Sequence, residues 1–173
     1  MPIWGNIVVY MTSYFRIYDE SITLQNTFMV FPLTLCLGAT AMQLGSVMLD
    51  YLNPKVHLAI GGLIYVGAIA ISSYITNFYI FVLFYSILAG IGYGIIYILP
   101  LKNAWLFFPN NKGMVGGIIL ASHSFAAIGW TFLTTSIINP DNDMPNLYIN
   151  VGNSLEVLYD KDSDAANNVP KCV

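Results

Sequence analysis

The feature that most constrains this chain is a long run without charge. Residues 56–101 contain no Asp, Glu, Lys or Arg, and most of them are apolar. One helix of that run would be about 69 Å long at 1.5 Å per residue, whereas the hydrocarbon core of a bilayer is roughly 30 Å thick. The run must therefore fold back on itself. The polar stretch from Ser72 to Asn77 marks the turn, which predicts two spanning helices over residues 56–76 and 78–101.

Two further apolar stretches are long enough to cross a bilayer. They cover residues 28–49 and 113–138, and polar turns at 50–55 and 109–113 separate them from the central pair. Residues 1–15 are apolar but too short to span unaided. The chain is 57% hydrophobic and 9% charged, against roughly 25% charged residues in soluble domains. We therefore expect an all-α integral membrane protein with a partial first helix and four spans.

The chain divides into two expected parts. Residues 1–140 form the transmembrane bundle, and residues 141–173 form a polar, acidic tail that we expect to be loosely ordered on the surface. If the helices alternate in direction, Lys55, Lys102 and Lys112 share one membrane face, while Arg16 and the tail share the other. The excess of lysines predicts that their face is the cytoplasmic or matrix side.

Several functional classes have no support in the composition. The net charge is −3 and no basic patch exists, so nucleic acid is not an expected partner. The two cysteines, Cys36 and Cys172, have no metal-ligand spacing around them. No catalytic pattern of Ser, His and Asp, and no paired carboxylates within a span, is present. We expect no enzyme activity, no metal and no cofactor.

Glycines cluster at helix-packing spacing. The cluster comprises Gly90, Gly92, Gly94, Gly113, Gly116 and Gly117. Small residues four apart let helices approach closely in lipid, where packing drives association. The hypothesis is that these glycines form helix-packing faces. The alternative is that they form surfaces that rock against each other in a transporter.

A few polar side chains in the apolar segments are candidates for a cavity. His123 lies near the middle of the last span, and an ionisable group there is costly and a functional candidate. Tyr10, Tyr14, Tyr93 and Tyr97 could line a substrate cavity with hydroxyl groups. The alternatives are a histidine satisfied by neighbouring helices and tyrosines that anchor helix ends at the interface.

Three segments resemble transporters of the major facilitator superfamily, of the oxalate/formate antiporter-like and monocarboxylate transporter-like type found in protists. The first runs from Trp4 to Arg16, the second from Gly90 to Pro100, and the third from Phe107 to Ile118 with its Phe-Pro-Asn-Asn-Lys-Gly loop. The resemblance covers about residues 4–140. It implies the N-terminal half of such a fold.

The departures from that family pattern shape the functional hypothesis. In the family's loop motif between helices 2 and 3, Asp50 and Lys55 match. Ser46, Tyr51 and Asn53 replace a glycine, an arginine and a second glycine. The resemblance also implies that the sixth helix, the second half, and the cations that pair with a carboxylate substrate are missing.

These departures favour a non-transporting accessory subunit of a larger membrane complex. A respiratory complex of the inner mitochondrial membrane is one possible host. The expected partners are then the lipid bilayer and other membrane subunits. The alternative is a half-transporter, or a fragment of a carrier, for oxalate, formate or a monocarboxylate. Only that alternative implies a small carboxylate substrate.

Overall fold

Four helical stretches in the described part of the chain are long and apolar enough to cross a membrane. The computed structural model describes residues 4–151, 154–161 and 163–171. The four stretches are Leu24–Tyr51, Pro54–Ser72, Phe78–Phe107 and Pro109–Ile138. The protein is therefore a multi-pass integral membrane protein built as an all-α bundle. This confirms the fold class expected from the sequence.

Most of these stretches consist of more than one helical element. The first joins α2 (Leu24–Phe28) to α3 (Val30–Tyr51), and the second is α4 (Pro54–Ser72). The third joins α5 (Phe78–Phe81), a π-helical segment (Val82–Leu88) and α6 (Ala89–Phe107). The fourth is a 3-10 turn (Pro109–Asn111) followed by α7 (Lys112–Ile138).

Asparagine caps fix where two of the spans begin. The Asn53 side chain accepts a hydrogen bond from the backbone N–H of Lys55, and Pro54 occupies the first helical position of α4. The Asn77 side chain accepts bonds from the backbone N–H groups of Tyr79 and Ile80 at the start of α5. Such caps satisfy N–H groups that have no partner within the helix. The Asn77 cap places the polar turn between α4 and α5 where the sequence predicts it.

The third span ends later than predicted. The sequence places its end at Leu101, just after Pro100, but α6 continues through Pro100 to Phe107. Proline removes one backbone hydrogen bond, and membrane helices tolerate this loss because neighbouring groups satisfy the freed carbonyl. Lys102 therefore belongs to the last two turns of α6 rather than to a loop.

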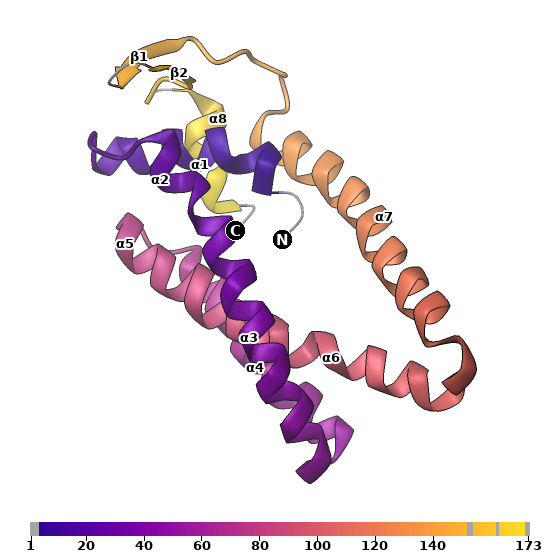
Figure 1. Ribbon diagram of the computed structural model, residues 1–173. Coiled ribbons are helices and arrows are strands. Elements are labelled where there is room, and N and C mark those ends of the chain that lie inside the picture. Colours follow the sequence, from indigo (N-terminus) through magenta and orange to yellow (C-terminus); the bar gives the residue numbers. More distant parts are fainter. Residues whose placement is uncertain (1–3, 152–153, 162, 172–173) are drawn as a thin grey trace.

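The short first helix lies across one end of the bundle. Helix α1 (Trp4–Tyr18) runs across the spans instead of parallel to them (Figure 1). Aromatic side chains on its buried face pack against aromatic side chains at the start of the third span, and together they form a buried core. The Phe15 and Phe81 ring centroids are 4.9 Å apart, and those of Trp4 and Tyr85 are 5.2 Å apart. This packing buries the helix that the sequence identifies as too short to span.

The tail is folded, so the expectation of a loosely ordered segment is wrong. It forms an antiparallel hairpin of β1 (Leu147–Val151) and β2 (Ser154–Leu158), then α8 (Asp164–Asn167) and a 3-10 turn (Val169–Lys171). Leu158, Ala166 and Val169 are almost fully buried against the rest of the protein. These apolar side chains anchor the tail beside α1.

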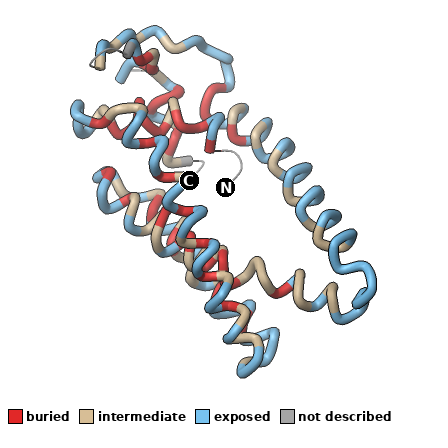
Figure 2. The backbone as a smooth tube through the Cα atoms, in the orientation of Figure 1, coloured by how far each residue is buried: buried red, intermediate tan, exposed pale blue. Residues whose placement is uncertain are grey.

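The spans pack unevenly. Helices α3, α4 and α6 lie against one another, whereas α7 diverges from them and meets the rest mainly near its two ends (Figure 1). Only 6% of the most apolar segment of the α7 span is buried. Figure 2 shows that most residues of α7 are exposed or partly buried. One face of the bundle is therefore open to lipid or to further helices.

Candidate functional site

An aromatic cluster containing His123 lies between α6 and α7. The His123 ring centroid is 6.2 Å from that of Tyr93 and 6.3 Å from that of Tyr97. Tyr65 of α4 extends the cluster, with its ring 6.3 Å from Tyr93. All four side chains are half-buried. The cluster therefore offers three hydroxyl donors and one imidazole beside the open face of the bundle.

Tyr10 and Tyr14 lie elsewhere, on α1 beneath the tail. Tyr10 stacks on Tyr159 at 4.9 Å, and Asn139 reaches the hydroxyl groups of both. Tyr14 packs against Phe15 and Tyr18. The five residues proposed for one cavity thus separate into two places. Tyr93, Tyr97 and His123 are together, Tyr10 belongs to the contact between α1 and the tail, and Tyr14 packs against other aromatic residues of α1.

The tail is held onto α1 and α2 by a set of polar contacts. The backbone N–H of Tyr159 donates to Ser13 Oγ at 2.9 Å, and the carboxylate of Glu156 accepts from the backbone N–H of Leu24 at 3.0 and 3.1 Å. Lys161 forms an ion pair with Glu20, with 2.5 Å between Nζ and Oε1. None of these contacts is visible in the local sequence, because each joins residues more than a hundred positions apart.

These contacts alter the titration of groups at the tail end of the bundle. The hydrogen bond from Lys161 is the main cause that lowers the pKa of Glu20. Burial, reinforced by the hydrogen bond with Tyr10, raises the pKa of Tyr159. The Tyr159 hydroxyl therefore stays protonated and donates to the Asp143 carbonyl at 3.1 Å.

The glycines fall into two groups. A Cβ placed at Gly92 would lie 2.6 Å from the Tyr65 backbone nitrogen, and one at Gly94 would lie 2.2 Å from the Gly38 carbonyl oxygen. At Gly90 the nearest atom would be the Thr34 carbonyl oxygen, at 3.1 Å. These three positions are therefore points of close approach between α6 and the neighbouring helices.

The α7 glycines make no such approach. A Cβ at Gly113 or Gly117 would meet nothing within 4 Å, and one at Gly116 would be 4.0 Å from Leu101 Cδ2. The role of these three glycines in helix packing stays a prediction, and it requires a partner on the open face of α7.

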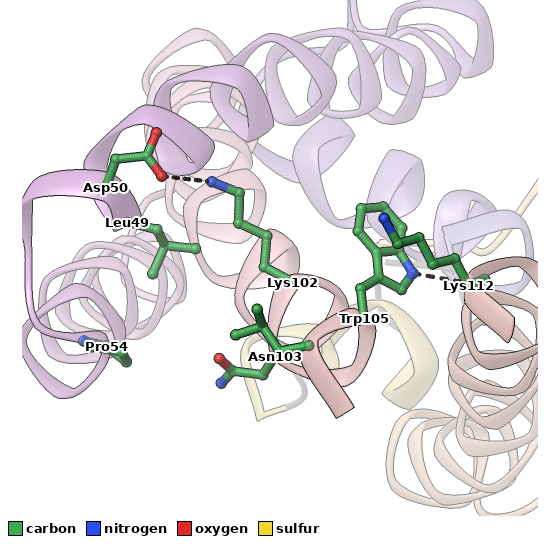
Figure 3. Close-up of a pocket in the computed structure, with 8 residues that line it drawn as sticks. Leu49, Asp50, Pro54, Lys102, Asn103, Trp105 and Lys112 are labelled. Carbon is green, nitrogen blue, oxygen red and sulfur yellow. Dashed lines mark hydrogen bonds and ion pairs between the residues drawn. The ribbon is translucent and has the colours of Figure 1, made fainter. Parts of the chain in front are cut away.

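Two of the positions compared with the loop motif, Ser46 and Asp50, are joined by Lys102 at the end of the bundle opposite the tail. Lys102 Nζ donates to the Ser46 carbonyl at 2.7 Å and to Asp50 Oδ1 at 3.1 Å. Lys55 is exposed at the start of α4 and does not join this contact. Lys102 and Asp50 line an open hollow of about 440 Å³ together with Leu49, Pro54, Asn103, Trp105, Leu106 and Lys112 (Figure 3).

His57, near the start of α4, is a buried polar residue. Its side chain is completely buried, and Nε2 lies 2.7 Å from the Ile95 carbonyl oxygen of α6. Within the described chain, Nδ1 is a buried side-chain atom without a hydrogen-bond partner. The contact depends on how α4 crosses α6, and the position of His57 near a helix start gives no sign of it.

Comparison with known proteins finds sequence similarity to a carrier. It is 26% identical to "Apicoplast pyruvate carrier 1" of Toxoplasma gondii, over an alignment of 197 positions that covers 93% of this chain and 36% of the carrier. The chain thus spans about a third of that relative's length. No family model matches the sequence, and no solved structure matches it.

These findings correct one expectation and agree with another. The expected membership of the major facilitator superfamily, as an N-terminal half of the oxalate/formate antiporter-like or monocarboxylate transporter-like type, is wrong. No family model matches, and the relative that is found is a pyruvate carrier. The relative's name is that of a carrier, in agreement with the prediction that the chain is not an enzyme. The chain is a multi-pass membrane protein with a distant pyruvate carrier relative.

Proposed function

We propose that this chain forms one wall of a membrane carrier for a small monocarboxylate such as pyruvate. The observation that carries the proposal is the alignment of 93% of the chain with a pyruvate carrier. Pyruvate has one carboxylate, one carbonyl and a methyl group. A site for it needs hydrogen-bond donors beside an apolar wall, and the cluster of Tyr65, Tyr93, Tyr97 and His123 has both.

The charges of the spans explain why further helices are part of the proposal. In the described chain, the lysines and the arginine lie at helix ends or outside the spans, at Arg16, Lys55, Lys102, Lys112, Lys161 and Lys171. An anion inside a membrane is costly unless a cation or strong donors compensate it. The open face of α7 leaves room for additional helices that would supply this compensation and close the pathway.

The compartment belongs to the same proposal. The relative's name assigns that protein to an organelle, the apicoplast, and we propose an organelle membrane for this chain as well. The inner mitochondrial membrane, expected from the sequence, has no support from this relative.

An accessory subunit is the second candidate, and a specific observation favours it. The spans lack a central cation, and the exposed side of α7 carries large apolar residues such as Phe125, Trp130 and Phe132. These would pack against neighbouring membrane subunits as well as against lipid. This role needs no substrate.

One experiment separates the two candidates. The tagged protein is solubilised gently from its membranes and run on a native gel, and mass spectrometry identifies the proteins that migrate with it. The purified protein with these partners is then reconstituted into vesicles, and uptake of radiolabelled pyruvate is measured. Saturable uptake that falls at least tenfold in His123→Ala, and not in Ser136→Ala at an exposed position of the same helix, is the expected result. A stable multi-subunit assembly without uptake would overturn the carrier and favour the accessory role.

A further inference from the structure

The open hollow lined by Lys102 and Lys112 lies where all four spans reach the same membrane face. Asp50 is in the last turn of α3, Pro54 is the first residue of α4, Lys102 and Trp105 are in the last turns of α6, and Lys112 begins α7. The helix ends define the edge of the hydrocarbon layer. The hollow is therefore at the depth of the lipid headgroups.

The charge of the hollow favours an anion. Its lining contains two lysines and one aspartate. The ion pairs in the described chain are Lys102–Asp50 and Lys161–Glu20, so Lys112 has no carboxylate partner there. One positive charge in the hollow is thus left uncompensated. Basic pockets between membrane helices on the cytoplasmic or matrix side, where the sequence predicts these lysines to lie, bind anionic lipid headgroups.

The two sides of the hollow are held in place by contacts within the protein. Figure 3 shows the Asp50–Lys102 pair on one side and Trp105 with Lys112 on the other. The Trp105 indole N–H donates to the Lys112 carbonyl at 3.2 Å. This bond ties the end of α6 to the start of α7, so both lysines line the same hollow, with the Lys102 ammonium directed towards Asp50 and Lys112 beside Trp105. Tryptophan at this depth is typical of residues in contact with headgroups.

The rim of the hollow is apolar, as a lipid would require. Leu106 lines the hollow and is 79% exposed, and Phe107, Phe108 and Met114, which are neighbours in sequence of its lining residues, are exposed as well. A soluble anion would gain nothing from this surface. Acyl chains would cover it, because they lie beside the helices once the headgroup is seated.

We propose that this hollow binds the phosphate headgroup of an anionic phospholipid. Lys112 and Lys102 hold the phosphate, Asn103 offers an amide donor at the same level, and the acyl chains lie along the exposed ends of α6 and α7. Asp50 competes with the phosphate for Lys102 and so limits the affinity. The site is separate from the Tyr93, Tyr97 and His123 cluster, and the inference does not depend on the proposed transport function.

The test is a thermal-shift titration of the purified protein in neutral detergent. The ligands are dioctanoyl phosphatidylglycerol, dioctanoyl phosphatidylcholine and inorganic phosphate. Phosphatidylglycerol should raise the unfolding temperature in a saturable way, and the other two should not. Lys112→Gln should weaken the apparent affinity about fivefold. Lys55→Gln is the matched control, since Lys55 is an exposed lysine at the same membrane face that does not line the hollow.

A second variant keeps the inference falsifiable if Lys112→Gln folds poorly. Asp50→Asn releases Lys102 from its carboxylate and should tighten phosphatidylglycerol binding, measured against the variant's own baseline. Equal weakening in Lys55→Gln and Lys112→Gln would mean general surface attraction and overturn the site. Stabilisation by inorganic phosphate as strong as that by phosphatidylglycerol would overturn the lipid as its occupant.

Discussion

At the scale of single residues, Gly94 gives the sharpest prediction about packing. A Cβ at this position would lie 2.2 Å from the Gly38 carbonyl oxygen and 2.7 Å from the Ala41 Cβ. Backbone atoms cannot move away cheaply, so α3 and α6 would have to separate. Overpacking of this kind costs roughly 1–3 kcal/mol. We expect Gly94→Ala to lower the thermal unfolding temperature in detergent by several degrees.

Gly67 provides the matched control for that experiment. It is also inside a span, and a Cβ there would meet nothing within 4 Å. Alanine is a better helix former than glycine by roughly 1 kcal/mol, so Gly67→Ala should be neutral or slightly stabilising. Equal losses in the two variants would show that the α3–α6 approach is looser than described.

At the scale of elements, the attachment of the tail should depend on pH through Glu20. The bond from Lys161 lowers the pKa of Glu20 below its ordinary value of 4.5. A carboxyl group whose pKa is lower in the folded state stabilises that state above the unfolded value, and this stabilisation is lost as the pH falls through the folded value. The protection of the tail amides against hydrogen exchange should therefore be constant from pH 7 to about 5 and decline below 4.5.

Hydrogen exchange of the tail amides measures this effect, after correction for the intrinsic pH dependence of exchange. The informative amides are those of β2 and of Tyr159, whose N–H is bonded to Ser13. Lys161→Gln removes the partner of Glu20, so this variant should show a smaller decline over the same acid range. An identical decline in both proteins would mean that other groups control the attachment.

A second element-scale prediction concerns the unequal packing of the spans. Phe81 is 1% exposed in the aromatic core, whereas Phe125 is 74% exposed on α7. Truncating a buried phenylalanine costs roughly 3–5 kcal/mol in soluble proteins, and the low end applies here because lipid is as apolar as the core. Phe81→Ala should destabilise by about 3 kcal/mol, and Phe125→Ala by less than about 0.5 kcal/mol. Unfolding in mixed micelles tests both.

The same comparison reports on hidden partners of α7. If Phe125→Ala destabilises the protein in native membranes but not after purification, another chain covers this face. A large loss in the purified protein itself would mean that α7 packs against the bundle more closely than the structure has it.

At the scale of the whole molecule, the sequence predicts the membrane spans and the turns between them, but it does not predict the contacts that depend on how the helices cross. The spans follow from uncharged length, and the turn after Ser72 follows from polar residues and an asparagine cap. The contacts of His57 with Ile95 and of Lys102 with Ser46 depend on the angle and register between helices, which a linear pattern does not contain. The sequence does not predict the folded tail, because the acidic residues give this segment a polar composition even though Leu158 and Tyr159 are buried.

The arrangement of the whole chain predicts that the loop before α7 and the tail face opposite sides of the membrane. Helix α7 has 27 residues, about 40 Å at 1.5 Å per residue, which exceeds the roughly 30 Å of hydrocarbon it must cross. Single cysteines at Asn110 and Asp160, in a background with Cys36 and Cys172 replaced by serine, should therefore react with a membrane-impermeant maleimide from opposite sides of sealed vesicles. Both sites should react once the vesicles are permeabilised. Reaction of both from one side would mean that α7 lies along the membrane, and the headgroup hollow at its start would then lose the helix end that defines its depth.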